Sequence, residues 1–248
     1  MAVLPHPVRL NEAVRRLGIP KSSASALFAT LERKGYVTSG RDGYVLAEPF
    51  RNGGWTGGHY AHLSRVSRPV MMRLVEETGE SAFLGIMTSD WSVQYVDKIT
   101  STSAVRYDVD LSESRPAYNT SVGHVFLASK SDEELEHYLA TQPFRKITPY
   151  TIADPRELRL AIQKVRQLGY AEAERSNDID SAGVSAGIVS AAGRTIATVS
   201  IVAPAARFAQ VRDRAIVAVT AAAARISEAL QQLPRSHSTS TKRTARGK

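Results

Sequence analysis

Two amphipathic segments joined by a very short connection constrain the fold of this chain most strongly. Residues 10–17 place apolar side chains at positions 10, 13, 14 and 17, and Gly18 follows them. Residues 22–34 repeat this spacing with Ala24, Leu27, Phe28 and Leu31. Apolar residues at such intervals share one face of an α-helix, so the sequence predicts two amphipathic helices, each followed by a glycine as a stop signal. Because only Gly18-Ile19-Pro20 joins the helices, we expect them to pack against each other.

The segment that follows predicts a hairpin. Residues 36–38 and 44–46 are short runs rich in tyrosine and valine, and Ser-Gly-Arg-Asp-Gly lies between them. Aromatic and β-branched residues on both sides of a glycine-containing turn are typical of two antiparallel strands. Helix, tight turn, helix and hairpin together form a winged helix–turn–helix, whose second helix is shaped to enter the major groove of DNA.

The outward face of the predicted second helix has the chemistry of a DNA contact. Its side chains are small or basic, which lets the helix backbone approach base edges and phosphates, and its free N-terminal amides attract a phosphate. A basic residue at the hairpin tip is placed to reach the backbone or the minor groove. An ordinary solvated helix face, or a protein contact, would fit the same pattern. The candidate DNA-binding residues are Lys21, Ser22, Ser23, Ser25, Arg33 and Arg41.

Several short runs along the chain also resemble a known family. In order, these runs are Gly18–Ser23, Leu27, Ala29–Glu32, Gly35–Val37, Tyr44–Leu46, Glu77–Glu80, Arg115–Thr120, Gly123 with Leu127–Ala128, Thr148–Ile152 and Leu168–Tyr170. Each run is weak alone, but their order and spacing resemble the IclR family of bacterial transcriptional regulators as far as about residue 230. The resemblance implies a second, effector-sensing domain similar to a GAF domain, assembly into dimers or dimers of dimers, and regulation of nearby catabolic genes.

Composition agrees with this reading and excludes several other classes. The chain has 248 residues, 43% hydrophobic and 23% charged, as in ordinary globular proteins. It has no cysteine, which excludes disulfides and thiolate metal sites. No apolar run approaches the roughly 20 residues that span a membrane, and the N-terminus lacks the pattern of a secretion signal, so we expect a cytoplasmic protein. The net charge of +8 is concentrated in residues 1–50 and in the tail after position 234, with a balanced middle.

The chain divides into four predicted parts. Residues 1–50 are the DNA-binding domain, and residues 51–78 comprise a glycine-rich linker and a linker helix with a kink or restart at Pro69. Residues 79–233 are the effector-binding domain, and residues 234–248 are a disordered basic tail. The expected class is α+β: a winged helix–turn–helix that lacks its first helix, then a GAF-like α/β domain with an antiparallel sheet.

Within the effector-binding domain, strands are expected at residues 81–87, 93–98 and 104–109, and a hairpin at residues 184–189 and 195–202. Helices are expected at residues 120–128, 131–140, 154–168 and 209–232, two of them opened by capping residues, Ser131 and Asp154-Pro155.

Resemblance to the family implies where an effector would bind. The family's pocket is formed by a strand, the loop before a helix and the last hairpin. Carried over by position, the candidate effector-binding residues are Tyr107, Ser121, Val122, Ser181, Gly183, Ser200 and Val202, and the nearby cation Arg115 is added to them as a candidate. Val202 and Ala173 stand where some relatives have polar residues, so the pocket favours an aromatic or aliphatic acid over a two- or three-carbon one. Arg106 or Arg115 could pair its carboxylate, and a structural ion pair is the alternative for each.

Catalytic and metal chemistry find little support in the sequence. Gly183-Val184-Ser185-Ala186-Gly187 matches a nucleophile elbow, but a strand follows it where that motif needs a helix. His59 and His62 lack a carboxylate or cysteine partner for a metal site. His124 stands where most of the family has lysine and is expected to cap or pack. Asp97 and Lys98 are expected to form a surface pair. We therefore expect no catalytic site, metal or cofactor. The alternative is an enzyme that uses the second domain catalytically, with the winged helix as an interaction module.

One expectation concerns packing in the first domain. A winged helix normally buries three helices together, and in the family the first of them precedes the segment matched by Leu4-Pro5-His6-Pro7. Without that helix, the apolar faces of residues 10–17 and 24–31 lose a shared cover. Either the true start lies upstream of Met1, which we favour, or the domain is weakened and leans on a dimer partner. The sequence leaves open the operator, the effector, and whether the protein represses or activates.

Overall fold

The computed structural model describes residues 7–33, 36–40, 43–46 and 60–232. The predicted hairpin-tip contact Arg41, the glycine-rich linker, His59 and the basic tail lie outside the described residues.

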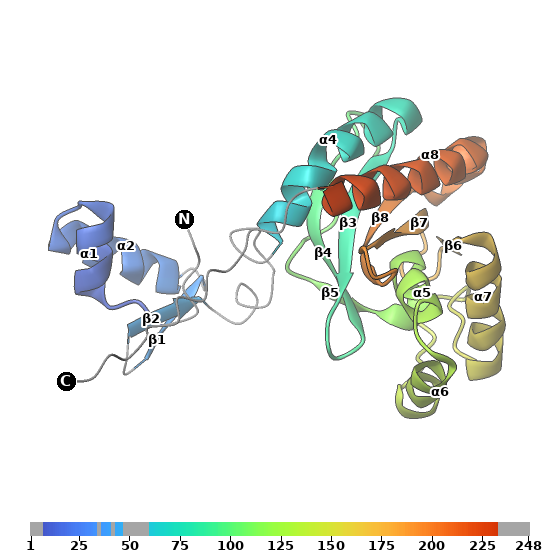
Figure 1. Ribbon diagram of the computed structural model, residues 1–248, viewed down its shortest axis with the longest axis horizontal. Coiled ribbons are helices and arrows are strands. Elements are labelled where there is room, and N and C mark those ends of the chain that lie inside the picture. The colour runs from blue at the N-terminus through green and yellow to red at the C-terminus, as the bar shows by residue number, and fades with distance from the viewer. Residues whose placement is uncertain (1–6, 34–35, 41–42, 47–59, 233–248) are drawn as a thin grey trace, which may run out of the picture.

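The N-terminal part has the predicted helix–turn–helix and hairpin (Figure 1). Helix α1 spans Leu10–Leu17 and ends at Gly18, whose φ of 64° is readily adopted by glycine. Helix α2 spans Lys21–Arg33, one residue earlier than expected. Strands β1 (Val37–Gly40) and β2 (Gly43–Leu46) pair antiparallel, which confirms the hairpin.

A short N-terminal segment extends this hairpin. The backbone N–H of Val8 donates to the Tyr44 carbonyl over 2.8 Å, and the Tyr44 N–H donates back over 2.9 Å. Gly43 makes this approach possible because its φ is 131° and a Cβ there would lie 2.6 Å from the Val8 oxygen. The ring of Tyr44 also packs 4.5 Å, centroid to centroid, from that of Phe28 on α2.

Apolar burial among the described residues of this part is thin. Its buried apolar side chains among the described residues are Ala13, Ala24 and Val37, two of them alanines. Leu17 on α1 and Leu27 on α2 are 46% and 43% exposed.

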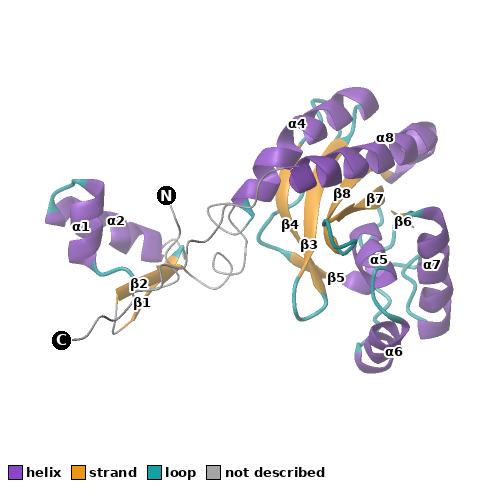
Figure 2. Cartoon of the chain, in the orientation of Figure 1, coloured by secondary structure: helices purple, strands orange, loops and turns teal. Residues whose placement is uncertain are grey.

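The second part, residues 60–232, is built on one six-stranded antiparallel sheet (Figure 2). Its strand order is β5-β4-β3-β8-β7-β6. The strands are β3 (Ser81–Met87), β4 (Ser92–Ile99), β5 (Ser114–Pro116), β6 (Tyr170–Glu174), β7 (Ser181–Val189) and β8 (Thr195–Pro204). The expected α+β class and antiparallel sheet are therefore confirmed.

One predicted strand was wrong. Residues 104–109 are not a strand but a loop beside β4, and the third strand in sequence is β5. Side chains of β3 and β4 donate hydrogen bonds to backbone carbonyls of this loop. Ser81 Oγ donates to the Tyr107 carbonyl over 2.7 Å, and Lys98 Nζ donates to the Val109 carbonyl over 2.6 Å. These contacts hold the segment at the edge of the sheet without a ladder of backbone bonds. Strand β6 was not predicted.

Helices cover both faces of the sheet (Figure 1). Helices α4 (Ala61–Thr78) and α8 (Ala205–Gln232) pack on one face, against alternate residues such as Leu84, Val184 and Ile201. Pro69 lies within α4, which continues through it, so the predicted restart is not found. The other face, which includes Phe83, is covered by α5 (Ser121–Ala128), α6 (Asp132–Thr141) and α7 (Pro155–Leu168).

The helix ends follow the predicted capping signals. Ser131 and Glu134 form a reciprocal capping box at the start of α6. Asp154 caps α7 with Pro155 in its first turn, and Gly169 ends it with a φ of 78°. None of the helices that the structure describes combines the length and apolar character needed to cross a lipid bilayer.

Candidate DNA interface and effector site

The predicted DNA-contact residues on α2 lie on its exposed side. Lys21, Ser22 and Ser23 form its first turn, where backbone N–H groups lack partners within the helix. Ser25 and Arg33 are exposed as well, and the Arg33 guanidinium makes a long contact of 3.4 Å with the Thr30 hydroxyl. The first turn contains no acidic residue that would repel a phosphate.

The hairpin is fixed to α2 by a polar contact that the sequence analysis missed. Glu32 Oε1 accepts hydrogen bonds from the Ser39 backbone N–H over 3.1 Å and from its hydroxyl over 2.5 Å. A hydrogen bond to a carboxylate is among the stronger ones, so this pair fixes the angle between the helix and the hairpin. An acidic residue near the DNA-facing surface therefore has a positioning role.

Four side chains form the aromatic half of the candidate effector site. The ring of Phe83 lies 5.1 Å from that of Tyr95 and 6.1 Å from that of Tyr107, measured between centroids. The Arg115 guanidinium carbon lies 5.5 Å from the Tyr95 ring centroid, a cation–π contact. Only 12% of the Arg115 side chain is exposed. A largely buried cation therefore lies among aromatic rings.

The two tyrosines of this group remain neutral at ordinary pH. Burial raises the pKa of Tyr95, and the neighbouring Tyr107 raises it further, while Arg115 acts in the opposite direction. Burial likewise raises the pKa of Tyr107, against the opposing effects of Arg115 and the Ser181 hydroxyl. Both phenols are hydrogen-bond donors rather than phenolates, and the positive charge of Arg115 is not cancelled by them.

Small and polar residues form the other half of the candidate site, on the sheet face under α5. Ser121 and Ser185 lie with their hydroxyl oxygens 2.7 Å apart, and Ser200 donates to the Phe83 carbonyl over 3.3 Å. Gly183 pairs with Val202 across the β7–β8 ladder, and a Cβ there would lie 2.9 Å from the Ile201 carbonyl. Ser181, at the start of β7, donates to the Asp178 carbonyl over 3.2 Å. Val122 is fully buried behind them.

Neighbours that the sequence analysis did not name take part in this candidate site. Phe83 and Tyr95 carry the aromatic contacts, and Asn119, fully buried just before α5, donates from Nδ2 to Asn177 Oδ1 over 2.9 Å. The Asn119 side-chain carbonyl has no hydrogen-bond partner among the described residues. Strand alternation indicated which of these residues are buried but not that they face Arg115.

The two arginines considered as carboxylate partners differ sharply. Arg106 is exposed and donates to the Ser103 carbonyl over 3.3 Å, away from the aromatic rings. Arg115 is the cation within the aromatic group, and its carboxylate partner, Glu113, is 66% exposed and 3.3 Å away.

The structure also places the residues that were considered for catalysis or metal binding. Ser185 lies within strand β7 rather than at a strand-to-helix turn, so the elbow geometry is absent there. His124 is buried and its Nε2 lies 2.7 Å from the Tyr118 carbonyl. His62 is exposed with its Nδ1 3.0 Å from Arg65, and in the part of the chain that the structure describes no cluster of metal-ligating side chains occurs.

The expected Asp97–Lys98 surface pair was wrong. Asp97 is 6% exposed and accepts from Arg68 on α4 over 2.6 Å, whereas Lys98 pairs with Asp108. The two neighbours point to opposite faces of the sheet, as successive residues of a strand do.

Two family models match this chain. The model of the bacterial transcriptional regulator IclR C-terminal domain matches residues 58–228, and the IclR helix–turn–helix domain matches residues 2–40. The chain belongs to the IclR family. It is accordingly a DNA-binding transcriptional regulator with an effector-sensing C-terminal domain. The family assignment favours this function over the enzyme alternative.

Individual relatives agree with this assignment. The HTH-type transcriptional regulator KipR of Bacillus subtilis is 28% identical over 204 residues, covering 82% of this chain and 81% of the relative. The crystal structure of Thermotoga maritima IclR is 25% identical with a TM-score of 0.66, covering 92% of both chains. An IclR homolog from Microbacterium hydrocarbonoxydans, in complex with 4-hydroxybenzoate, is 23% identical with a TM-score of 0.66, covering 92% of this chain and 94% of that one.

Proposed function

We propose that this IclR-family regulator senses an aromatic or medium-length aliphatic acid at the Arg115 site. The observation that carries the proposal is the environment of Arg115, whose side chain is 12% exposed while Glu113, its carboxylate partner among the described residues, is 66% exposed. A cation held away from water needs a partner, and an exposed pair contributes little. A ligand carboxylate bound beside Arg115 would satisfy the charge, and the rings of Phe83, Tyr95 and Tyr107 would contact the ligand's apolar part.

The expected size of the ligand follows from the other residues of the candidate site. Val122 and Val202 are apolar, and the Ser121 and Ser185 hydroxyls already bond each other. A two- or three-carbon acid would leave the aromatic and valine side chains without contacts. The homolog in complex with 4-hydroxybenzoate supports the idea that this fold accommodates a ring-bearing acid.

Transmission toward the DNA-binding domain is proposed to run through the turn after α4. Ser81 Oγ donates to the Tyr107 carbonyl over 2.7 Å and accepts from the Ser101 N–H over 3.1 Å. Ser101 Oγ in turn donates over 2.6 Å to the carbonyl of Gly79, the residue that caps α4. A ligand that moves Tyr107 would therefore pull on the C-terminal end of the linker helix through these bonds.

The proposal also covers the domain boundaries, the DNA contacts and the assembly of the protein. We place the DNA-binding domain at residues 1–50, with Lys21, Ser22, Ser23, Ser25, Arg33 and Arg41 at the interface. The linker region is residues 51–78, the effector domain is residues 79–233 and a basic tail is residues 234–248. We further propose a homodimer or dimer of dimers acting in the cytoplasm, where its DNA operator lies. A dimer would present two recognition helices to two half-sites.

The test is a thermal-shift and calorimetric titration of the full chain with 4-hydroxybenzoate, benzoate, hexanoate, glyoxylate and pyruvate. We expect saturable stabilisation by a ring-bearing or six-carbon acid. Arg115→Met should weaken that binding by about tenfold or more, because a charge-assisted hydrogen bond contributes roughly 1.5–3 kcal/mol. Arg106→Met is the matched control and should leave binding unchanged. Stabilisation by glyoxylate or pyruvate alone would overturn the ligand class, and equal losses in both variants would overturn the role of Arg115.

A further inference from the structure

A groove lies at the other end of the sheet face that carries the candidate effector site. Phe83 and Ser200 of that site are paired in the middle of β3 and β8. The groove lies farther along these strands, where β3 ends at Met87 and β8 begins at Thr195. The groove, of about 540 Å³, is bounded by the turn after β3, the end of α5, the start of α6 and the β7–β8 hairpin. Its volume is in the range of small-molecule sites.

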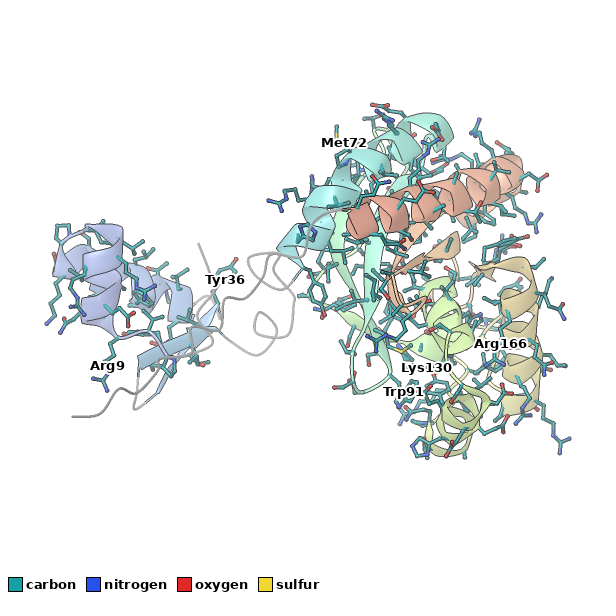
Figure 3. All side chains as sticks on the ribbon, in the orientation of Figure 1. Arg9, Tyr36, Met72, Trp91, Lys130 and Arg166 are labelled. Atoms are coloured by element: carbon teal, nitrogen blue, oxygen red, sulfur yellow. The ribbon has the colours of Figure 1, made fainter. Side chains whose placement is uncertain are left out.

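The groove combines an apolar lining with two cations. Met87, Trp91 and Phe126 are wholly or partly buried in its lining, and Ile196, 43% exposed, stands at its edge. Lys130 places its Nζ 5.2 Å from the Trp91 ring centroid, and Figure 3 shows these two labelled side chains close together at the end of the domain. Arg194 borders the groove from the hairpin, and no carboxylate in the described part of the chain pairs with it.

The position of Trp91 is fixed by its turn and by a neighbouring ring. Trp91 has a φ of 64°, which is rare for a bulky residue and is found where surrounding contacts impose it. Asp90 imposes it here, because its carboxylate accepts from the Thr88 hydroxyl and from the Ser92 N–H and hydroxyl. The Trp91 N–H also donates to the Thr88 carbonyl over 3.2 Å. The indole also packs 5.2 Å, centroid to centroid, from the ring of Tyr138 on α6. It is therefore held in place before any ligand binds, which reduces the ordering cost of binding.

The Lys130 side of the groove is equally well ordered. Arg166 on α7 donates to the Ala128 and Lys130 carbonyls over 3.0 and 2.8 Å and pairs with Asp132 at 2.6 Å. The one acidic lining residue, Glu134, accepts from Lys130 over 3.2 Å and from the Ser131 N–H over 3.0 Å. Glu134 therefore orients Lys130 and offsets part of its charge, whereas no carboxylate in the described part of the chain pairs with Arg194.

The geometry points to a second ligand site in this groove, for a small organic anion that carries a flat ring. The ring would lie against Trp91, Phe126 and Ile196, and the anionic group would meet Arg194 and Lys130. This site is separate from the proposed effector site at Arg115, so each of the two proposals can be tested without the other. It provides a place where a second metabolite could bind the same domain.

The two tryptophans of the chain allow a direct test, because Trp55 lies outside the described residues and Trp91 lines the groove. In the full-length Trp55→Phe protein, Trp91 emission is followed during titration with 4-nitrobenzoate, a ring-bearing anion that quenches indole, and with neutral 4-nitrobenzyl alcohol. Arg115→Met is added to this background to suppress binding at the effector site. We expect saturable quenching by the anion and only linear, collisional quenching by the alcohol.

Charge variants then locate the anion. Arg194→Gln and Lys130→Gln should each raise the apparent Kd about tenfold, the expected loss for one charge-assisted hydrogen bond. Glu134→Gln should lower it, because glutamine keeps the capping box and releases Lys130. Arg156→Gln and Lys164→Gln, exposed residues of α7, are the matched controls and should leave it unchanged.

Linear quenching by the anion, or the same Kd in all these variants, would overturn the site. Sedimentation of the same proteins distinguishes a ligand site from a contact between copies of the chain. If Arg194→Gln changes the oligomeric state without changing the Kd, the groove is such a contact and the ligand proposal is wrong.

Discussion

At the scale of single residues, burial decides the charge of His124. This side chain is 4% exposed, and its Nε2 must carry the proton because the Tyr118 carbonyl, 2.7 Å away, can only accept. Burial lowers the pKa of His124, and the hydrogen bond to Tyr118 opposes the decrease only in part. The folded protein therefore holds a neutral imidazole where the unfolded chain would become protonated.

The consequence is a pH-dependent stability with a defined sign. As pH falls below the unfolded pKa of about 6.5, the unfolded state binds a proton that the folded state does not bind. The free energy of unfolding therefore falls by up to about 1.4 kcal/mol per pH unit. Urea unfolding at pH 7, 6 and 5 should show this loss. His124→Gln, whose amide can still donate to Tyr118, should lessen it. An unchanged pH slope in the variant would show that His124 is not the group responsible.

How far single residues could be predicted depends on whether they act alone or through tertiary contacts. Exposure of Lys21 and Ser25 follows from helical periodicity within one segment, so sequence was sufficient for it. The contact between Arg115 and Tyr95 depends on β5 pairing with β4, and Arg106 and Arg115 could not be distinguished without it. The buried Asp97 was mistaken for a surface residue because its partner, Arg68, lies 29 positions earlier on another element.

At the scale of elements, the fold was predictable wherever a local signal set the boundary. Gly18, Ser131 and Gly169 end or begin helices where the sequence placed them. The loop at residues 104–109 shows the limit, since alternation predicts an extended segment but not whether its backbone finds a neighbouring strand. Strand β6 is short and carries Glu172 and Glu174, and it is a strand because β7 pairs with it.

The two parts of the chain should respond differently to loss of a leucine. Leu74 on α4 is 2% exposed within the main core, whereas Leu17 on α1 is 46% exposed. Leu74→Ala should destabilise the sensor domain by about 2–5 kcal/mol, through lost burial and a cavity. Leu17→Ala should cost no more than about 0.5 kcal/mol. Calorimetric scans of both variants test this, and a large loss from Leu17→Ala would mean that a dimer partner or another segment covers α1.

The turn after α4 should couple the two functions. Ser81→Ala removes the hydrogen bonds to Tyr107 and Ser101 while leaving Arg115 in place. Acid affinity should therefore change little, while the effect of the acid on DNA affinity should shrink. Ser103→Ala is the control, because Ser103 lies in the same loop and, among the described residues, Tyr107 accepts from the Ser81 hydroxyl rather than from that of Ser103. Full coupling in Ser81→Ala would show that the signal takes another route.

At the scale of the whole molecule, charge is placed where an IclR-family regulator needs it. The excess of eight positive charges gathers in the first 50 residues and the tail, and the sensor domain between them is nearly balanced. Electrostatic attraction to phosphates should therefore act on the DNA-binding end, with the sensor domain left to discriminate ligands. Specificity for an operator then depends on contacts that α2 makes with base edges.

The most direct test of the central claim is the affinity of the full-length protein for the DNA upstream of its own gene. Fluorescence anisotropy would be measured over a range of salt, with and without the stabilising acid. We predict tighter binding to this DNA than to a scrambled fragment, a change in affinity when the acid is added, and in Lys21→Ala a salt slope reduced by about one charge. Equal affinity for scrambled DNA, together with no response to any acid, would contradict the account.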